Sequence, residues 1–586
     1  MTKFLLFLLS TLLAAGAEYH QASGDAAFEQ VANDYIDGYL RWRPLTAVSL
    51  GLHQYDGKLT DYSHASIEIE LTRLKSFERR LSEMETRTLG PDAFYDFRIL
   101  RNSIRREIFG FEDMKQFTDN PMTYSGAIDV NVYIKRDFAP LENRVRSIVS
   151  ILKQAPKVMA AARENLVEVL PRPQVETAIE STTGGIDFLS KDLVTAVQGI
   201  KDEALMAEFK QANDAAIEEA KKFAAWLKDE KLPKANAPYA LGHEKYIKML
   251  ACGEMIQLPP EQLLQIGLKE LKRKQQVFAD TARLIDPKHK PIEVFKAIQK
   301  DHPTEQTLIP DTAKNLDAIR DFVVNRQLIT LPSQVRAQVK ETPQYLRATS
   351  FASMDTPGPF EVRGTEAYYY VTPVEPDWSA QQKEEWLTAF NYYTTDVVSI
   401  HEAYPGHYVQ FLCLKASPAT RIEKIFQGYA FTEGWAHYAE QMMIDQGFGG
   451  FGGLSQSQAE QLKMARYRLA QTDEALLRVC RLCVSLKMHT EGMNVADATK
   501  FFVDNCYYEE KPAHSEAVRG AYDPEFLYYT LGKLEIFKLR DDYQKQERSR
   551  FSLQKFHDEM LKHGSPPIRL LREKMLKDKK LWPETF

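Results

Sequence analysis

The sequence predicts a mainly α-helical protein with one small β-sheet, and three observations support this. From about residue 25 to 330, apolar residues recur at helical spacing in one segment after another, separated by proline-containing breaks. From about 330 to 378, short runs rich in β-branched and aromatic residues stand among Pro and Gly, which is typical of strands. After Pro376 the helical pattern resumes and continues to the end of the chain.

The first helical part is clearest in the stretch 201–233, which is rich in Ala, Glu and Lys and ends at Pro233. Breaks are expected at 170–174, 231–238 and 257–262, where prolines suit loops or helix starts. The strands are expected in SQVRAQVK (333–340) and EAYYYVTP (366–373). The sheet therefore precedes the second helical part directly.

The chain has 586 residues, whereas a single hydrophobic core stops growing at roughly 250 to 300 residues. Two lobes or a large domain of several parts are therefore expected. The boundaries are a leader at 1–17, an N-terminal helical part at 18–330, and a part with the sheet and the C-terminal helices at 331–586.

The amino terminus has the layout of a secretory signal peptide. Lys3 precedes an apolar run from Phe4 to Ala15, and small residues at Ala15 and Ala17 favour cleavage after Ala17. The run is shorter than the roughly 20 residues that span a bilayer, and no cysteine at the cleavage site could carry a lipid. We expect a secreted or periplasmic protein without stable membrane insertion after cleavage.

The charge is nearly balanced, with 75 basic against 81 acidic residues. Nucleic-acid-binding proteins usually carry a strong basic excess or a clustered basic stripe. The composition therefore argues against a nucleic-acid partner.

The segment HEAYPGH, residues 401–407, carries the strongest chemical signal. An apolar stripe that steps by four, three, four and three residues predicts a helix running into it, and comprises Trp386, Phe390, Tyr393, Val397 and Ile400. On a straight helix, His401 and His407 would lie about 120° apart around the axis, too far to share a metal ion. Pro405 must kink or bulge the helix, however, and Gly406 permits the backbone that this needs. We therefore expect residues to loop out so that the two histidines converge.

A third ligand is expected on a second helix at 428–443. Glu433, His437 and Glu440 share one face there, at i, i+4 and i+7. Catalytic zinc sites usually have three protein ligands and one open position. We choose Glu433 as the ligand and place His437 and Glu440 behind the ligands or along the cleft. Two histidines and one glutamate suit a single Zn²⁺ ion best among common metals.

Several segments resemble the bacterial DUF885 proteins, which are grouped with the gluzincin-type zinc metallopeptidases and are similar in fold to the neurolysin, angiotensin-converting-enzyme and carboxypeptidase Taq families. They are HEAYPGH, TEGWAHYAE (432–440), the run 519–540, and RWRPLTAVSLGLHQYDGKLTDYS (41–63). The resemblance implies a large two-lobed, neurolysin-like helical fold with a deep cleft, with a small sheet beside the metal helix, forming one continuous unit over about residues 25–575.

The resemblance also implies roles for individual residues. A glutamate ligand some two dozen residues beyond the second histidine corresponds to Glu433, which lies 26 residues after His407. Glu402 is placed to act as the general base. A tyrosine near the carboxyl end would stabilise the oxyanion, with Tyr529 and Tyr522 as the candidates.

Three further features have both a functional and a structural interpretation. Arg519 could clamp a substrate carboxylate, or form an internal salt bridge with Glu516. His489 matches a family position expected to contact substrate, although a lone histidine is more often structural. The strand EAYYYVTP could be the sheet edge that pairs with an extended substrate, or simply pack in the core.

These expectations combine into one leading hypothesis, a zinc-dependent metallopeptidase that cleaves peptide bonds of oligopeptides with a water molecule activated by Glu402. A metal-dependent hydrolase of another amide or ester remains an alternative. A non-catalytic peptide-binding protein with the same fold is a third possibility, since family resemblance alone does not establish activity.

Overall fold

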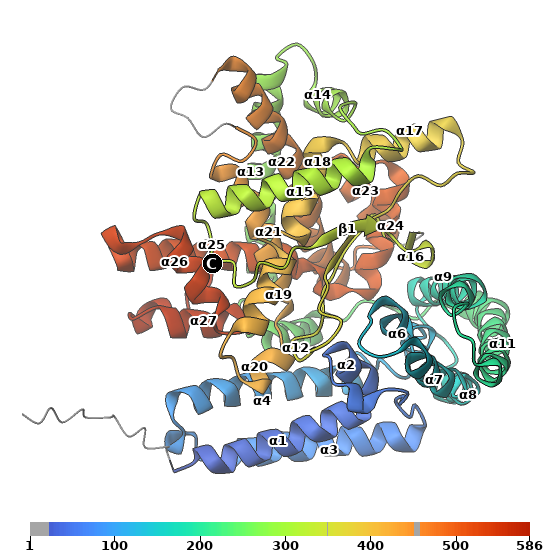
Figure 1. The fold of residues 1–586 in the computed structure, drawn as a ribbon. Coiled ribbons are helices and arrows are strands. Elements are labelled where there is room, and N and C mark those ends of the chain that lie inside the picture. Colours follow the sequence, from blue (N-terminus) through green and yellow to red (C-terminus); the bar gives the residue numbers. More distant parts are fainter. Residues whose placement is uncertain (1–22, 348–349, 451–456) are drawn as a thin grey trace, which may run out of the picture.

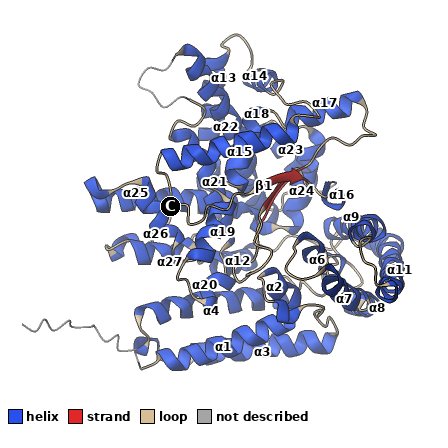
Figure 2. Ribbon diagram, viewed as in Figure 1, coloured by secondary structure: helices blue, strands red, loops and turns tan. Residues whose placement is uncertain are grey.

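The computed structural model describes residues 23–347, 350–450 and 457–586, and helices make up most of this part of the chain (Figure 1). Strands form only a small patch among the helices (Figure 2). The predicted mainly α fold with a small sheet is thus confirmed. In the described ranges, no helix combines the length and apolar character needed to span a membrane. The predicted signal peptide, 1–17, lies outside these ranges.

The N-terminal helices form a layer of their own, drawn in blue in Figure 1. They are α1 (Asp25–Trp42), α2 (Pro44–Ser49), α3 (His64–Ser82) and α4 (Pro91–Glu112). Aromatic side chains such as Phe28, Tyr35 and Phe77 fill their core. The same cluster includes Phe426 and Leu570 from the C-terminal half, so this layer packs directly against the later helices.

A second group of helices follows, drawn in teal in Figure 1. It contains α5 (Met122–Ser125), α6 (Asn131–Lys135), α7 (Leu141–Leu152), α8 (Ala155–Asn165), α9 (Arg172–Asp187), α10 (Leu193–Ala196) and α11 (Glu203–Trp226). Helix α11 packs against α7, α8 and α9. It corresponds to the predicted stretch 201–233, whose last residues form a π-helical turn at Leu227–Lys231 and a 3₁₀ turn at Leu232–Lys234.

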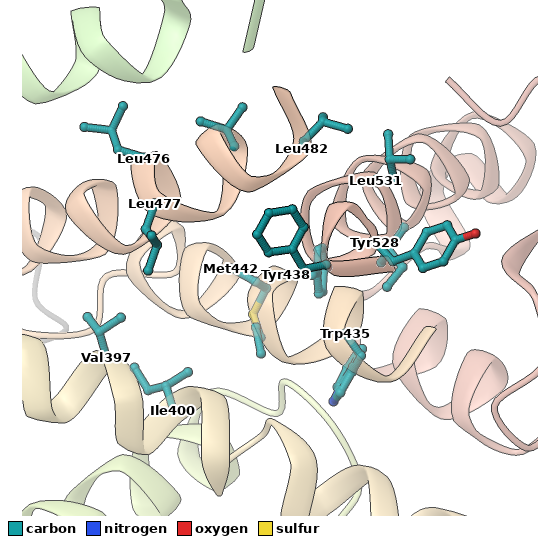
Figure 3. Packing of buried hydrophobic residues seen from close by; sticks show 14 of the residues in the cluster. Val397, Ile400, Trp435, Tyr438, Met442, Leu476, Leu477, Leu482, Tyr528 and Leu531 are labelled. Atoms are coloured by element: carbon teal, nitrogen blue, oxygen red, sulfur yellow. The ribbon is translucent and has the colours of Figure 1, made fainter. Parts of the chain in front are cut away.

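The remaining helices follow, and most of them surround one large hydrophobic core. They are α12 (His243–Glu254), α13 (Pro260–Ile285), α14 (Pro291–Ile298), α15 (Leu308–Asn325), α16 (Gln344–Arg347), α17 (Ala380–Ala389), α18 (Tyr392–Glu402), α19 (His407–Ala416), α20 (Arg421–Ile425), α21 (Tyr429–Asp445), α22 (Gln458–Thr490), α23 (Val495–Cys506), α24 (Glu510–Tyr522), α25 (Tyr528–Glu547), α26 (Leu553–Leu561) and α27 (Ile568–Met575). Figure 3 shows apolar side chains of α18, α21, α22 and α25 meeting in this core. These four helices also carry most of the candidate site residues.

The sheet contains β1 (Gln338–Glu341), β2 (Ala352–Asp355) and β3 (Tyr368–Val371) in the order β1-β3-β2. Strand β3 is parallel to β1 and antiparallel to β2. The two predicted strand segments therefore appear as β1 and β3. Because β3 is the central strand, the expectation that EAYYYVTP forms a sheet edge is wrong, and β2 is an edge instead.

The apolar stripe that predicted one helix up to the HEAYPGH motif is shared by two helices. Helix α17 ends at Ala389 and α18 begins at Tyr392. Between them Asn391 accepts a hydrogen bond from the backbone N–H of Thr394 at 3.0 Å, which is an N-cap. The helix that enters the motif is therefore short and starts at its own cap.

Helices α21 and α25 approach each other through two glycines. A Cβ atom on Gly532 would lie only 1.8 Å from the backbone oxygen of Ala430, and one on Gly434 would lie 2.5 Å from the carbonyl carbon of Gly532. The two backbones are therefore in direct contact, which no larger residue permits. This contact sets α25 beside the part of α21 that carries Glu433.

We expect Gly532→Ala to lower the stability of the protein by about 3 kcal/mol or more, because its methyl group must push two helix backbones apart. Gly184→Ala in α9 is the matched control, since a Cβ atom there has no neighbour within 4 Å. Removing that glycine from a helix should stabilise the protein by up to about 1 kcal/mol. Thermal unfolding followed by circular dichroism measures both, and equal midpoints for the two variants would contradict the proposed contact.

Candidate metal centre

The HEAYPGH motif folds as a helix, a turn and a new helix. Helix α18 ends at Glu402 and α19 begins at His407, with a cis Tyr404–Pro405 peptide bond between them. The N–H of Gly406 donates to the carbonyl of Ile400 at 3.0 Å. A Cβ atom on Gly406 would lie 1.7 Å from the carbonyl oxygen of His401, so only glycine fits. The predicted departure from a straight helix is confirmed, as a complete break.

This break brings the two histidines together. The rings of His401 and His407 lie 4.8 Å apart at 90° to one another. The turn is fixed from the neighbouring helix α21, because the indole N–H of Trp435 donates to the carbonyl of Pro405 at 2.9 Å. The six-residue spacing of the histidines is therefore compatible with a shared ligand.

Glu433 on α21 faces both histidines. Its Oε2 atom lies 3.5 Å from Nε2 of His401 and 3.5 Å from Nε2 of His407. Three ligand atoms at zinc bond lengths in a tetrahedral site lie roughly 3.3 to 3.6 Å apart. The two distances from Glu433 to the histidines fit such a site.

Glu433 also shows the sign of a missing partner. Its Oε2 atom is buried and makes no hydrogen bond within the described part of the chain. Buried carboxylate oxygens are normally hydrogen-bonded or bound to a metal. Burial raises the pKa of Glu433, but the two histidines outweigh burial and hold that pKa well below its usual range. The ionised form, which a metal ion requires, is thus favoured.

Glu402 lies at the same centre but in a different setting. A ligand atom of each of His401, Glu402 and His407 lies within 4.8 Å of the others, so this trio could also hold a metal ion. The carboxylate of Glu402, however, accepts a hydrogen bond from the backbone N–H of Met354 in β2 at 3.0 Å. We assign Glu433 as the third ligand because its oxygen is unpaired and equidistant from both histidines, which leaves Glu402 beside the ligands.

Behind the ligands, the carboxylate of Glu440 connects three helices. It lies 2.7 Å from Nδ1 of His401, 3.0 Å from Nδ1 of His437 and 3.4 Å from Nη2 of Arg478 on α22. A proton on Nδ1 of His401 leaves the lone pair of Nε2 free to face the metal position. The predicted supporting role of Glu440 and His437 agrees with this geometry.

Neighbouring charges set the protonation states of the buried groups, Glu440 and His401 among them. Burial raises the pKa of Glu440, but Arg478 and His437 outweigh it and keep the carboxylate ionised. Burial lowers the pKa of His401, but the carboxylates of Glu433 and Glu440 outweigh this and raise it to about 9, so a metal ion would have to displace a proton from this histidine. Lys533 on α25 lies 3.4 Å from Nε2 of His437, and burial lowers the pKa of this lysine to about 8.

The two candidate tyrosines are clearly separated. The ring of Tyr529 lies 6.5 Å from that of His401, nearly parallel to it. Tyr522 instead lines cavities beside Glu180 of α9 and Asn120. The geometry therefore favours Tyr529 for a role at the centre.

Arg519 and His489 lie further out. Arg519 pairs with Asp523 at 3.0 Å, whereas Glu516 pairs with Arg481 at 2.7 Å, so the expected Arg519–Glu516 salt bridge is wrong. His489 is buried and uses both ring nitrogens on backbone groups, those of Leu241 and Gly520. The structure does not bring His489 to the metal position.

Sequence reasoning missed several groups that complete the site. Arg478 contacts Glu440, and Lys533 contacts His437. The backbone of Met354 bonds to Glu402, and the ring of Tyr429 lies 5.8 Å from that of Tyr529. A usable signal existed for Lys533, which follows Tyr529 by four residues and so shares its helix face. The contact of Met354 depends on how the strands pair, which short runs do not reveal.

Two solved structures are similar to this chain over nearly its whole length. The first is "a putative lipoprotein of unknown function from Shewanella oneidensis", 25% identical, with a TM-score of 0.76, covering 94% of this chain and 100% of that one. The second is "the putative lipoprotein from Colwellia psychrerythraea", 17% identical, with a TM-score of 0.75, covering 96% of this chain and 100% of that one, and it shows the fold alone. No curated protein shows a significant match.

The family comparison covers α2 to α27 and, with them, the candidate metal centre. A family model described as "Bacterial protein of unknown function (DUF885)" matches residues 44–575, and the chain therefore belongs to the DUF885 family.

Proposed function

We propose that this protein is a zinc-dependent metallopeptidase that cleaves peptide bonds of oligopeptides. The observation that carries the proposal is one unpaired, buried oxygen of Glu433 that lies 3.5 Å from a nitrogen of each of two histidines, with a second glutamate beside them. A resemblance of the motifs to gluzincin-type peptidases, with their neurolysin-like fold, supports the same assignment.

His401, His407 and Glu433 would hold the metal ion. When bound, zinc supplies Lewis acidity, which polarises a carbonyl group and makes water more acidic. Glu440 orients His401 through its Nδ1 atom, and Arg478 keeps that carboxylate charged. Three protein ligands would match catalytic zinc sites, which keep one further position open.

Glu402 acts as the general base in this proposal. Its carboxylate is held by the N–H of Met354, which fixes its orientation while leaving oxygen lone pairs free for a proton. Glu402 takes a proton from the attacking water and delivers it to the leaving amine. Tyr529, stacked near His401, is placed to donate its hydroxyl hydrogen to the developing oxyanion.

The edge of β2 provides a place for an extended substrate. Strand β2 pairs with β3 on one side only, and the N–H of Met354 points away from β3 toward Glu402. The unpaired side of β2 therefore faces the centre. A peptide that adds to this edge would place its backbone alongside Glu402.

The protein would act outside the cytoplasm, in the periplasm or after secretion. The leader pattern around Lys3 and the run Phe4–Ala15 supports this location. The solved structures similar to this chain are described as lipoproteins, which agrees with an extracytoplasmic site of action.

We expect Glu402→Gln to lower peptide hydrolysis by about 10² to 10⁴-fold, because it removes the group that transfers the proton. Zinc content should stay near that of the wild type, since Glu402 is not a ligand. Hydrolysis of a peptide library followed by mass spectrometry, together with elemental analysis, measures both quantities.

The control for Glu402→Gln is Glu385→Gln, an exposed glutamate of α17. This variant should hydrolyse the library at the wild-type rate. Undiminished hydrolysis by Glu402→Gln, or a purified wild type without zinc affinity, would refute the proposed mechanism. A parallel panel of non-peptide esters and amides separates a peptidase from another hydrolase.

We expect Glu440→Gln to weaken zinc binding by about 10- to 100-fold, because the amide no longer orients His401 as a carboxylate does. Glu433→Gln should weaken it further, because a ligand itself is lost. A competition titration against a zinc chelator ranks the variants. Equal affinities for Glu433→Gln and the wild type would contradict the ligand assignment.

A further inference from the structure

Three arginines surround the ring of Tyr529. Their guanidinium carbons lie 5.9 Å (Arg478), 5.1 Å (Arg481) and 6.0 Å (Arg519) from the ring centre. They come from α22 and α24, so two separate helices bring positive charge to one side of the metal centre. Such a concentration of guanidinium groups favours an anionic group of a ligand.

Two of the arginines are paired with carboxylates of the protein. Arg481 forms two hydrogen bonds to Glu516, at 2.7 and 2.8 Å. Arg478 is shared between Glu474 at 2.5 Å and Glu440 at 3.4 Å. Both arginine side chains are only 10% exposed, so they have little capacity for a further anion.

Arg519 is less engaged than the other two. Its Nε and Nη2 atoms both use a single oxygen, Oδ2 of Asp523, at 3.0 Å. Its side chain is 29% exposed, more than the side chains of Arg478 and Arg481. The hydroxyl of Tyr429 accepts a hydrogen bond from Nη2 at 3.4 Å, so its own hydrogen can be donated to the same ligand. The N–H groups of Arg519 that Asp523 and Tyr429 do not use can donate to a carboxylate oxygen.

Arg519 lies within a short peptide length of the metal ligands. The ring centre of Tyr529 lies 6.5 Å from that of His401. The guanidinium carbon of Arg519 lies 6.0 Å from the same ring centre of Tyr529. An extended peptide covers roughly 3.3 to 3.6 Å per residue. A carboxylate held by Arg519 would thus lie about one to three residues from a peptide bond at the metal centre.

We propose that Arg519, with the hydroxyl of Tyr429, binds the free carboxyl terminus of the substrate, so that the enzyme releases a short fragment from that end. The proposal rests on the peptidase function proposed above and specifies its substrate class. Arg519 could also bind the side-chain carboxylate of an Asp or Glu at the same position of the peptide. The substrates described below distinguish this carboxylate from the carboxyl terminus.

The test uses the zinc-loaded, full-length protein and three N-acetylated peptides of one sequence. The first has a free carboxyl terminus, the second a carboxyl-terminal amide, and the third an amide plus a glutamate at the last position. We expect the free acid to be cleaved with a kcat/KM on the order of 10- to 100-fold above both amides, the range of a charge-assisted hydrogen bond. Mass spectrometry should show one released fragment of one to three residues.

Two variants test Arg519 itself, and they have opposite expected effects. Arg519→Ala should lower kcat/KM for the free acid on the order of 10- to 100-fold and leave the amides almost unchanged. Asp523→Asn removes the competing carboxylate, so it should keep or improve cleavage of the free acid. If Arg519 only formed a helix ion pair, both variants would break that pair and would have the same effect.

Arg172→Ala is the matched control, since Arg172 forms an i,i+4 pair with Glu176 on α9. It should cleave all three peptides as the wild type does. Equal cleavage of the free acid and the amides would refute the binding of the carboxyl terminus by Arg519, but it would leave the proposed peptidase function intact. Faster cleavage of the glutamate peptide than of the free acid would show that Arg519 binds an acidic side chain and not the carboxyl terminus. If none of the three peptides were cleaved, the peptidase function itself would be refuted.

Discussion

The buried charge of Glu440 is the constraint on which the metal centre depends. An ionised carboxylate inside a protein costs several kcal/mol unless it is paired and hydrogen-bonded. Glu440 meets this requirement through His401 of α18, His437 of its own helix and Arg478 of α22. The three helices must therefore meet at one point, and that same meeting point orients His401, the first candidate ligand.

Close backbone contacts place the other groups around this point. Gly406 allows the chain to fold back against His401, and the Gly434–Gly532 contact sets α25 beside α21. Tyr529 and Lys533 reach the centre only because of the second contact. Glycine, which contributes nothing to the chemistry, thus decides which side chains can take part in it.

The sequence was sufficient for the mainly α fold, for two of the three strands and for the convergence of His401, His407 and Glu433, because helical spacing and a proline break are local signals. It could not place the sheet edge or the partner of Arg519, since strand order and ion-pair choice depend on contacts between distant segments. Tyr529 and Tyr522 were indistinguishable because both lie in one aromatic run, and only the packing of α25 separates them.

The edge of β2 also limits how a peptide can move. Along an edge strand, only every second residue turns its N–H and C=O outward, so the possible alignments of a bound peptide differ by two residues. Met354 provides one of these outward groups and joins it to Glu402. A peptide that paired with this edge could therefore shift only in steps of two residues. The backbone of β2 would set these steps, whatever the side chains of the peptide.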